Sequence, residues 1–351
     1  RLLSRGLGDV YKRQANTLAN IAEANTKLTG DNAKGIRLLK KSIGIQNELK
    51  DYHGLSKSYI KLGQAYAANG DVRTALNYYL KGVKLCEKVN DKKSAAICRL
   101  HMGQSYFSLQ NIDQAIVQYE KAQQLQEQLQ NTEGTALVFH ELGKTHHYKK
   151  EFEKAIEHFE SALDLYESAN NKVPKVDVLI SIGKTYLSNK ETANASSFYT
   201  EALTLSEKTD YQNGIAKAKL GLAQCHIQAQ EYEDAENLAI AAFEGFEELN
   251  LSNQIAKTHA VLSKIYEKQQ KTELAFDHYK SFVSLHDSIM SFKHHQNGLS
   301  SQTGELLTKV KPPKEVSNDT SKWSIQRLAI LSGVLVLIFL TIVTIRRRFK
   351  K

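Results

Sequence analysis

Small, aromatic and polar positions recur along the chain at a spacing of 40 residues. Residues 61–79, KLGQAYAANGDVRTALNYY, form the clearest copy, and three rows of positions define the repeat. The first row holds Gly63, Gly103, Gly143 and Gly183, followed by Ala223 and Ser263; the second holds Ala75, Ala115, Ala155, Ala195, Ala235 and Ala275; the third holds Tyr79, Tyr119, Phe159, Tyr199, Ala239 and Tyr279. A fixed period of this length predicts a solenoid of stacked units.

Each unit is predicted to be a hairpin of two helices, and seven hairpins are counted if a degenerate first copy at Ile21–Ile43 is included. Small residues let two helices approach closely, so a bulky residue at Ala115 or Ala155 is expected to cost about 1–3 kcal/mol. Residues 69–71 (Asn-Gly-Asp) and 30–31 (Gly-Asp) mark turns, because glycine tolerates the left-handed conformation and aspartate caps the next helix. The sequence therefore predicts an all-α solenoid stabilised by stacking between neighbours.

This pattern resembles the tetratricopeptide repeat, a helix–turn–helix unit with a leucine–glycine pair and an aromatic residue on its first helix. The resemblance covers about residues 15–288. Two features depart from the family: the period is 40 residues rather than about 34, and the proline that closes each repeat is absent. We expect the extra residues to lengthen both helices around the turns between repeats, at residues 90–91 and 170–171. Longer repeats of this kind occur in polarity adaptors and in bacterial peptide-sensing regulators.

The resemblance implies that the first helix of each repeat lines a concave groove that binds a protein or peptide. The position directly after the glycine row would then form a polar ladder along that groove: Gln64, Gln104, Lys144, Lys184, Gln224 and Lys264. Such side chains are able to meet the backbone or the acidic groups of a peptide. The alternative is a solvated face of Gln and Lys. Family members that grip a carboxyl terminus use Asn at this position, and none of the six is Asn.

The two ends of the array differ from it in composition. Residues 1–14 carry no helical periodicity that continues into the repeats and resemble a translated adaptor remnant, so they are set apart from the fold. Residues 15–288 are predicted to form the array. Residues 289–322, rich in Ser, Thr, Gly, Asn and Lys, contain Pro312-Pro313 and are predicted to form a linker.

Residues 323–345 are predicted to form one transmembrane helix. Leu328–Ile345 is 18 residues without a charge, about 27 Å of helix, with Trp323 near one interface. Five basic residues follow directly: Arg346, Arg347, Arg348, Lys350 and Lys351. The positive-inside rule then makes residues 346–351 a cytoplasmic stub and places the repeats outside. We therefore expect a single-pass protein of a bacterial inner membrane, in contact with the lipid bilayer through this span.

The formal charge of +9 at first favours nucleic acid as a partner, but its distribution does not. Residues 1–14 carry +3 and residues 346–351 carry +5, which leaves +1 for everything between. A near-neutral array has no phosphate-binding patch, so nucleic acid is not expected as a partner. The three cysteines, Cys86, Cys98 and Cys225, lack metal-ligand spacing and are expected to be small packing residues.

Two constellations suggest chemistry and are better explained by the repeat. Residues 143–145 and 183–185 both read Gly-Lys-Thr, but Val138 and Val178 stand where a phosphate-binding loop needs glycine. His140, His146 and His147 with Glu141 lack the HExxH spacing of a metalloprotease, and His146 occupies a slot that holds Tyr in other repeats. We expect no enzyme activity, metal site or cofactor in this chain.

The predicted function is that of a sensor or scaffold that binds a protein or peptide and relays binding across a membrane. In bacterial receptors that look like this, the output domain is a histidine kinase, a diguanylate cyclase or a helix–turn–helix regulator, and it would follow Lys351. Signalling through one span usually implies a homodimer. The alternative is a complete tail-anchored adaptor whose repeats recruit cytoplasmic partners. A third interpretation is a subunit of an envelope assembly or secretion machine.

Overall fold

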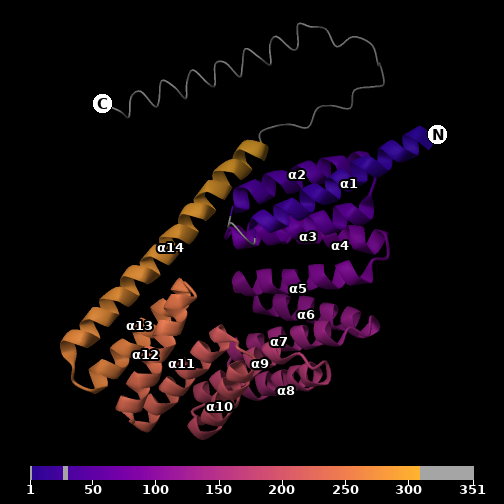
Figure 1. Ribbon diagram of the computed structural model, residues 1–351. Coiled ribbons are helices and arrows are strands. Elements are labelled where there is room, and N and C mark those ends of the chain that lie inside the picture. The colour runs from indigo at the N-terminus through magenta and orange to yellow at the C-terminus, as the bar shows by residue number, and fades with distance from the viewer. Residues whose placement is uncertain (1, 27–30, 309–351) are drawn as a thin grey trace, which may run out of the picture. The chain divides into compact units, whose positions relative to one another are not determined.

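A computed structural model describes residues 2–26 and 31–308 (Figure 1). These residues form 14 helices and no strand. The helices are α1 (Leu2–Ala24), α2 (Asn32–Glu48), α3 (Tyr52–Ala68), α4 (Val72–Lys88), α5 (Lys92–Ser108), α6 (Ile112–Gln128), α7 (Thr132–Tyr148), α8 (Phe152–Ser168), α9 (Lys172–Ser188), α10 (Thr192–Lys208), α11 (Gln212–Ala229), α12 (Tyr232–Glu248), α13 (Ser252–Lys268) and α14 (Thr272–Thr308). Paired in order, they make the seven hairpins that the sequence predicts.

The 40-residue period consists of two units of equal length, each made of one helix and one turn. The helices α2–α10, α12 and α13 are each 17 residues long, and three residues separate most of them from the next helix. One helix and one turn therefore occupy 20 residues, and a hairpin occupies twice that number. The turns between hairpins have three residues, like most of the turns within them, so residues 90–91 and 170–171 are not distinguished from the other turns.

From α2 onward, each turn places one residue in the left-handed region of backbone conformation. Gly70 does so with φ 82°, but non-glycine residues fill the other turns, with φ between 51° and 65°: Lys50, Asn90, Gln110, Gln130, Lys150, Asn170, Lys190, Asp210, Gln230, Asn250 and Gln270. In a representative turn, the Gln110 amide donates to the Phe107 carbonyl and the Asn111 amide to the Tyr106 carbonyl. These bonds satisfy carbonyls at the helix end. Glycine is therefore not what defines the turn.

Asp and Asn residues cap several of the helices at their first turn. The Asp71 carboxylate accepts a hydrogen bond from the Thr74 amide at 3.1 Å, and the Asp91 carboxylate accepts one from the Ser94 amide at 3.0 Å. Asp31, Asp51 and Asn131 cap α2, α3 and α7 in the same way. These side chains satisfy amides that have no partner inside the helix.

The glycine row and the aromatic row pack against each other inside the four hairpins from α3 to α10. A Cβ atom on Gly103 would clash with the ring of Tyr119, and the Gly63–Tyr79 pair repeats this contact. Tyr119 is fully buried, as are Ala115 and the other alanines of its row up to Ala235. The absence of a side chain on the first helix is therefore what makes room for a large ring from the second.

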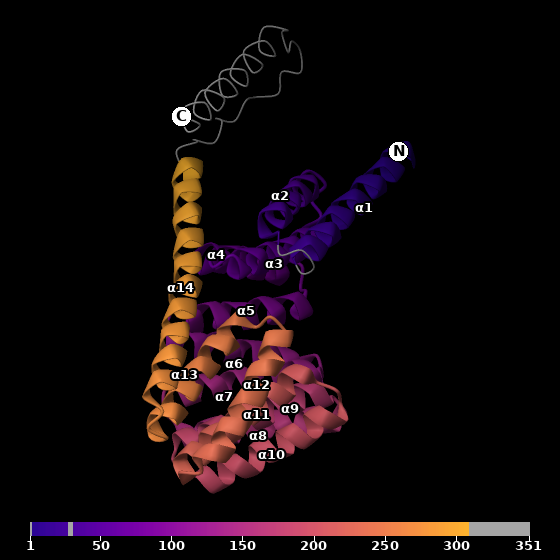
Figure 2. The same ribbon diagram turned by 60° about the vertical axis from the view of Figure 1, so that its left-hand side comes forward.

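Neighbouring hairpins bury these side chains together. One apolar cluster joins α3, α4 and α5, and another joins α11, α12 and α13. Every helix from α2 to α13 packs on its predecessor in sequence (Figures 1 and 2), and odd-numbered helices also contact one another. This packing lies within a compact unit of residues 1–301; of the second unit, residues 302–351, the described part is the end of α14. Stability is thus shared between adjacent hairpins.

The predicted fold class joined the solenoid to one transmembrane helix, and that second part is corrected by the structure. No helix within residues 2–26 and 31–308 is long and apolar enough to cross a membrane. The segment predicted to span, residues 323–345, and the basic residues 346–351 lie outside the described residues. The fold class that the structure supports is an all-α solenoid.

Both ends of the array also differ from what their composition indicated. Residues 2–14 belong to α1, a single helix that continues into the first hairpin, where Ala15, Ala19 and Ala22 are buried. At the other end, α14 continues through residues 289–308, which had been assigned to a linker. A polar composition does not interrupt a helix where no proline occurs, and Pro312-Pro313 lies beyond the end of α14.

Candidate functional site

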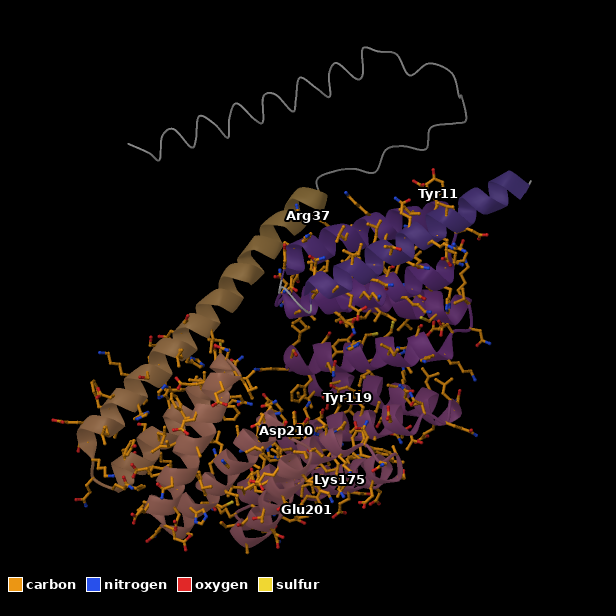
Figure 3. The ribbon with its side chains drawn as sticks, in the orientation of Figure 1. Tyr11, Arg37, Tyr119, Lys175, Glu201 and Asp210 are labelled. Carbon is orange, nitrogen blue, oxygen red and sulfur yellow. The ribbon has the colours of Figure 1, made fainter. Side chains whose placement is uncertain are left out.

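A cavity of about 1120 Å³ runs along the odd-numbered helices α7, α9, α11 and α13. We call it the groove. On each helix its lining residues are spaced three, four or seven apart, which places them on one helical face. The sets are Leu137, His140 and Lys144 on α7; Asp177, Ile180, Ser181 and Lys184 on α9; Lys217, Leu220 and Gln224 on α11; and Gln254 and Lys257 on α13. Figure 3 shows the ribbon with its side chains and labels the buried Tyr119 of α6 and the exposed Glu201 of α10.

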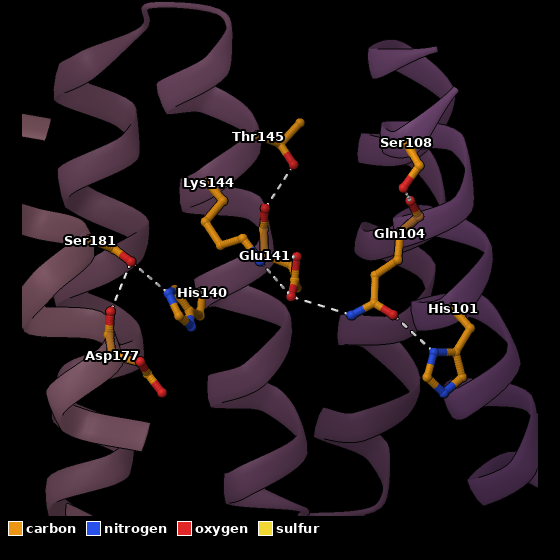
Figure 4. A network of polar contacts seen from close by, with 9 residues as sticks. All are labelled: His101, Gln104, Ser108, His140, Glu141, Lys144, Thr145, Asp177 and Ser181. Atoms are coloured by element: carbon orange, nitrogen blue, oxygen red, sulfur yellow. Dashed lines mark hydrogen bonds and ion pairs between the residues drawn. The ribbon is translucent and has the colours of Figure 1, made fainter. Parts of the chain in front are cut away.

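A directed chain of hydrogen bonds connects α3, α5 and α7, and Figure 4 shows its part between α5 and α7. The Gln64 amide lies 2.8 Å from Nε2 of His101, whose Nδ1 lies 2.9 Å from Oε1 of Gln104. The Gln104 amide donates at 3.3 Å to Glu141. Because Gln64 donates to Nε2, His101 must be neutral and carry its proton on Nδ1. Burial lowers the pKa of His101, which favours this neutral form.

This series of hydrogen bonds ends on the buried carboxylate of Glu141, which already forms an ion pair with Lys144. Both oxygens of Glu141, which is 8% exposed, accept from Nζ of Lys144, at 2.9 and 2.8 Å. Glu141 is thus compensated from its own helix and from α5. The positive charge of Lys144 is correspondingly committed to Glu141.

A second polar chain connects α7, α9 and α11. The Ser181 hydroxyl donates to the Asp177 carbonyl, so His140, 2.9 Å away through Nε2, donates to Ser181. The Asp177 carboxylate pairs with Lys217 at 2.9 Å. Burial lowers the pKa of His140 to about 4, so this ring is neutral at pH 7. Lys217, like Lys144, is neutralised within the scaffold.

Two lysines remain in the groove without an ion pair among the described residues. Lys184 and Lys257 both line the cavity and are exposed to solvent within it. Burial, together with the positive charges of Lys257 and Lys144, lowers the pKa of Lys184. No carboxylate among the described residues forms an ion pair with either lysine, whereas Lys144 and Lys217 each have one. The groove therefore presents an uncompensated positive centre at α9 and α13.

Apolar side chains flank this positive centre. Leu137, Ile180 and Leu220 line the groove from three successive odd-numbered helices. At one end, Tyr148 is 53% exposed and packs edge-on against Phe107 with ring centroids 5.4 Å apart. A groove that alternates apolar and charged groups along its length suits an extended polypeptide better than a small rigid molecule.

Family models described as tetratricopeptide repeat match residues 5–88, 95–168 and 176–209, together more than half of the 351 residues. The chain belongs to the tetratricopeptide repeat family. No curated protein matches it over its sequence.

Solved structures of similar fold have low sequence identity to this chain. The apo form of RapI is 14% identical with a TM-score of 0.66, over 79% of this chain and 99% of that one. The Rap conjugation gene regulator of plasmid pLS20, in complex with the Phr* peptide, is 17% identical with a TM-score of 0.58, over 77% and 73%. A signal transduction ATPase with a tetratricopeptide repeat sensor from Pyrococcus horikoshii is 21% identical with a TM-score of 0.58, over 71% of this chain but 39% of that one. These likenesses show the fold.

The structure divides the predicted polar ladder into three kinds of position. Gln64 and Gln104 are engaged in the bonds to the next repeat described above. Lys144, Lys184 and Gln224 line the groove, whereas Lys264 is exposed and not among the residues of the cavity wall. Sequence analysis did not identify Asp177, Lys217 and Lys257, each of which lies seven residues before a ladder position. These residues could have been identified from the sequence, because a residue seven positions before a ladder residue lies on the same face of the helix.

The three histidines of α7 contact different partners and do not converge on one point. His140 bonds to Ser181, and Nδ1 of His147 lies 2.9 Å from the Thr185 hydroxyl. His146 stacks on His158 with ring centroids 5.0 Å apart, in the slot that tyrosine fills elsewhere. Its Nδ1 lies 2.7 Å from Glu151, and this bond lowers the pKa of Glu151 to about 2. The two Gly-Lys-Thr triplets lie inside α7 and α9, not in a loop.

One further group has metal-ligand chemistry at the turn between α11 and α12. Ligand atoms of His226, Glu231 and Asp234 all lie within 4.8 Å of one another. His226 bonds to Glu231 at 2.6 Å, which repeats the His146–Glu151 contact two repeats earlier. The recurrence indicates a structural contact that ties a helix end to the following turn.

Proposed function

We propose that this tetratricopeptide repeat protein binds an extended peptide segment of a partner in the groove between α7 and α13. The observation that carries the proposal is the pair of lysines, Lys184 and Lys257, which have no ion-pair partner among the described residues and lie in a cavity whose other lysines are paired. Two like charges without a counter-charge repel each other and do not stabilise the folded chain. A ligand carboxylate would supply the missing charge.

The chemistry of the groove indicates which peptide it would take. An acidic side chain or a terminal carboxylate would lie between α9 and α13, at Lys184 and Lys257. Apolar side chains on either side would contact Leu137, Ile180 and Leu220. Polar groups of the lining, such as Gln224 and Gln254, are available to the peptide backbone. The peptide complex of the pLS20 Rap regulator, which shares this fold, supports a peptide as the ligand class.

The proposal is tested with a positional library of fluorescein-labelled peptides and the purified chain. We expect retained peptides to be enriched in Asp or Glu at one position, flanked by apolar residues. For a selected peptide, Lys184→Glu and Lys257→Glu should each weaken binding by about tenfold or more, because each replaces a charge-assisted contact by repulsion. Fluorescence anisotropy measures the loss.

Lys264→Glu is the matched control, since Lys264 belongs to the same ladder but not to the cavity wall. It should change the dissociation constant less than about twofold, because an exposed surface charge contributes little. Equal losses at Lys264 and Lys184 would mean a diffuse charge effect and not a groove site. No loss at Lys184 or Lys257 would mean that the peptide binds elsewhere.

Relay of binding to an output domain, and the alternative of an adaptor that only recruits partners, stay predictions from the sequence. A ligand that bridged α7 to α13 would contact several hairpins at once, and we propose that it changes the packing between them. Hydrogen exchange with and without the selected peptide distinguishes the two cases. Relay predicts altered exchange in α13 and α14, whereas a passive adaptor predicts protection confined to the groove helices.

A further inference from the structure

Two of the three cysteines face each other across the junction between the second and third hairpins. Cys86 lies in the last turns of α4, and Cys98 lies on α5, after the intervening turn. Both are buried in the same apolar cluster, and each thiol shifts the pKa of the other. At the equivalent positions of the other junctions stand Gln46 with Ser58, Gln126 with Val138, Tyr166 with Val178, Ser206 with Ala218, and Phe246 with Thr258. The repeat itself therefore does not require this pair.

The backbone beside the pair leaves room for sulfur. A Cβ atom on Gly82, one helical turn before Cys86, would lie 2.8 Å from Sγ of Cys98. The sulfur of Cys98 thus lies directly against α4, where a larger residue would hold the two helices apart. Close approach of two adjacent helices is the condition for a disulfide between them.

Cys86 also lines a second cavity, of about 370 Å³, which small solutes can enter. Lys92, Arg99 and Lys121 contribute cations to its wall, against Glu87 and Asp91. A hydroperoxide is small and needs no recognition beyond access to the thiolate. The cavity supplies a path to a thiol that is otherwise buried.

We propose that Cys86 and Cys98 form an oxidation site that hydrogen peroxide converts to an intramolecular disulfide. The Cys86 thiolate attacks one peroxide oxygen, the O–O bond breaks, and hydroxide leaves to give a sulfenic acid on Cys86. Cys98 then attacks the Cys86 sulfur, the S–O bond breaks, and water leaves as the S–S bond forms. In sum, two thiols and one hydrogen peroxide give one disulfide and two waters, with sulfur losing the two electrons that peroxide gains.

Access assigns the order of the two thiols, because Cys86 lines the second cavity whereas Cys98 is fully buried and does not. Interaction with the Cys98 thiol lowers the pKa of Cys86 against the opposing effect of burial, with a further contribution from Ser56. The same interaction and burial raise the pKa of Cys98. Cys86 is therefore the attacking thiolate and Cys98 the resolving thiol.

Cys225 is the internal control. It is buried to a similar degree, but burial raises its pKa to about 11, and no thiol shares its apolar cluster. If peroxide oxidised all buried thiols, Cys225 would also be oxidised. If oxidation requires the Cys86–Cys98 pair, Cys225 should stay reduced.

The test treats the purified full chain with hydrogen peroxide, then denatures it in N-ethylmaleimide and counts thiols. We expect the number of alkylated cysteines to fall from three to one. Because Lys88, Lys92 and Lys93 separate the two cysteines, trypsin should release residues 85–88 disulfide-linked to residues 94–99. The disulfide closes a short loop, so the oxidised chain should unfold about 5 °C higher than the reduced chain.

Variants separate the site from general oxidation. Cys98→Ser should leave Cys86 as a sulfenic acid that dimedone labels, Cys86→Ser should leave Cys98 reduced, and Cys225→Ser should form the disulfide as before. Circular dichroism checks that each variant is folded. Three thiols still alkylated after treatment, a sulfinic acid on Cys86 with Cys98 free, or equal oxidation of Cys225 would overturn the proposal.

Discussion

The two faces of the odd-numbered helices follow different rules. On the face toward the even-numbered helices, Gly63, Gly103 and Gly143 stand opposite aromatic rings, and the residue types hardly change from one repeat to the next. On the groove face, the row that contains Leu137 continues as Asp177, Lys217 and Lys257. The comparison shows that helix packing restricts volume and shape, whereas the groove places no common requirement on its residues. The repeated face therefore specifies the fold, and the varied face carries selectivity.

The largest effect should come from removing an aromatic ring on the repeated face. Tyr119→Ala deletes a fully buried ring that fills the space beside Gly103, and should lower the free energy of unfolding by about 3–5 kcal/mol. Urea denaturation followed by circular dichroism measures the loss.

Tyr279→Ala is the matched control, because Tyr279 occupies the same row on α14 but is 55% exposed. No further described helix packs on α14 in the way that each odd-numbered helix packs on its predecessor, so the ring lacks its second neighbour. The loss should stay below about 1 kcal/mol. Similar losses at both tyrosines would contradict the role of stacking between hairpins.

A smaller effect is expected on the groove face, from pH. The pKa of His140 is about 4 in the folded chain and about 6.5 when unfolded, so between these values the unfolded chain binds the proton and the folded chain does not. The contribution of neutral His140 to stability is complete above about pH 6.5 and is lost as the pH falls to about 4. The total is on the order of 3 kcal/mol.

Urea denaturation at pH 8 and at pH 4.5 measures this dependence. His140→Gln keeps a donor for Ser181 but cannot be protonated, so its loss of stability between the two pH values should be smaller than that of the unaltered chain. An identical loss in both proteins would mean that other groups account for the pH dependence.

The smallest effect should come from the turns, which are common to both faces. Gln110 adopts φ 59° and Gly70 adopts φ 82° at equivalent turn positions. Gln110→Gly relieves the conformational cost of a side chain in the left-handed region and should stabilise the chain by up to about 1 kcal/mol. Gly70→Ala should destabilise it by about 1 kcal/mol. Thermal unfolding of the pair checks both signs; destabilisation by Gln110→Gly would contradict the argument.

Much of the fold could be predicted from the sequence, because stacking repeats one packing problem and so repeats its solution. The period, the seven hairpins and the Gly103–Tyr119 type of contact all appear as rows of residues. The turns were harder to predict from the sequence, because Lys, Asn and Gln adopt the left-handed conformation there as well as glycine. At the ends, where no neighbouring repeat constrains the chain, composition was a poor guide: α1 includes residues 2–14 and α14 continues to Thr308.

The site was only partly visible in the sequence. Three of the predicted ladder positions, Lys144, Lys184 and Gln224, line the groove, and their role in binding stays a prediction. The ion pair of Lys217 could not be predicted, because its partner Asp177 lies 40 residues away in the sequence. The Cys86–Cys98 contact likewise depends on two helices folding back on each other.

The sequence by itself determined the helical hairpin and its repetition, because these depend on local spacing and on side-chain volume at fixed intervals. Only the tertiary structure decided which charges on the groove face are compensated. Ion pairs and hydrogen bonds between repeats, such as Gln104 to Glu141 and Lys217 to Asp177, form between atoms that only stacking brings within about 3 Å. The same stacking brings no carboxylate of the described residues into an ion pair with Lys184 or Lys257.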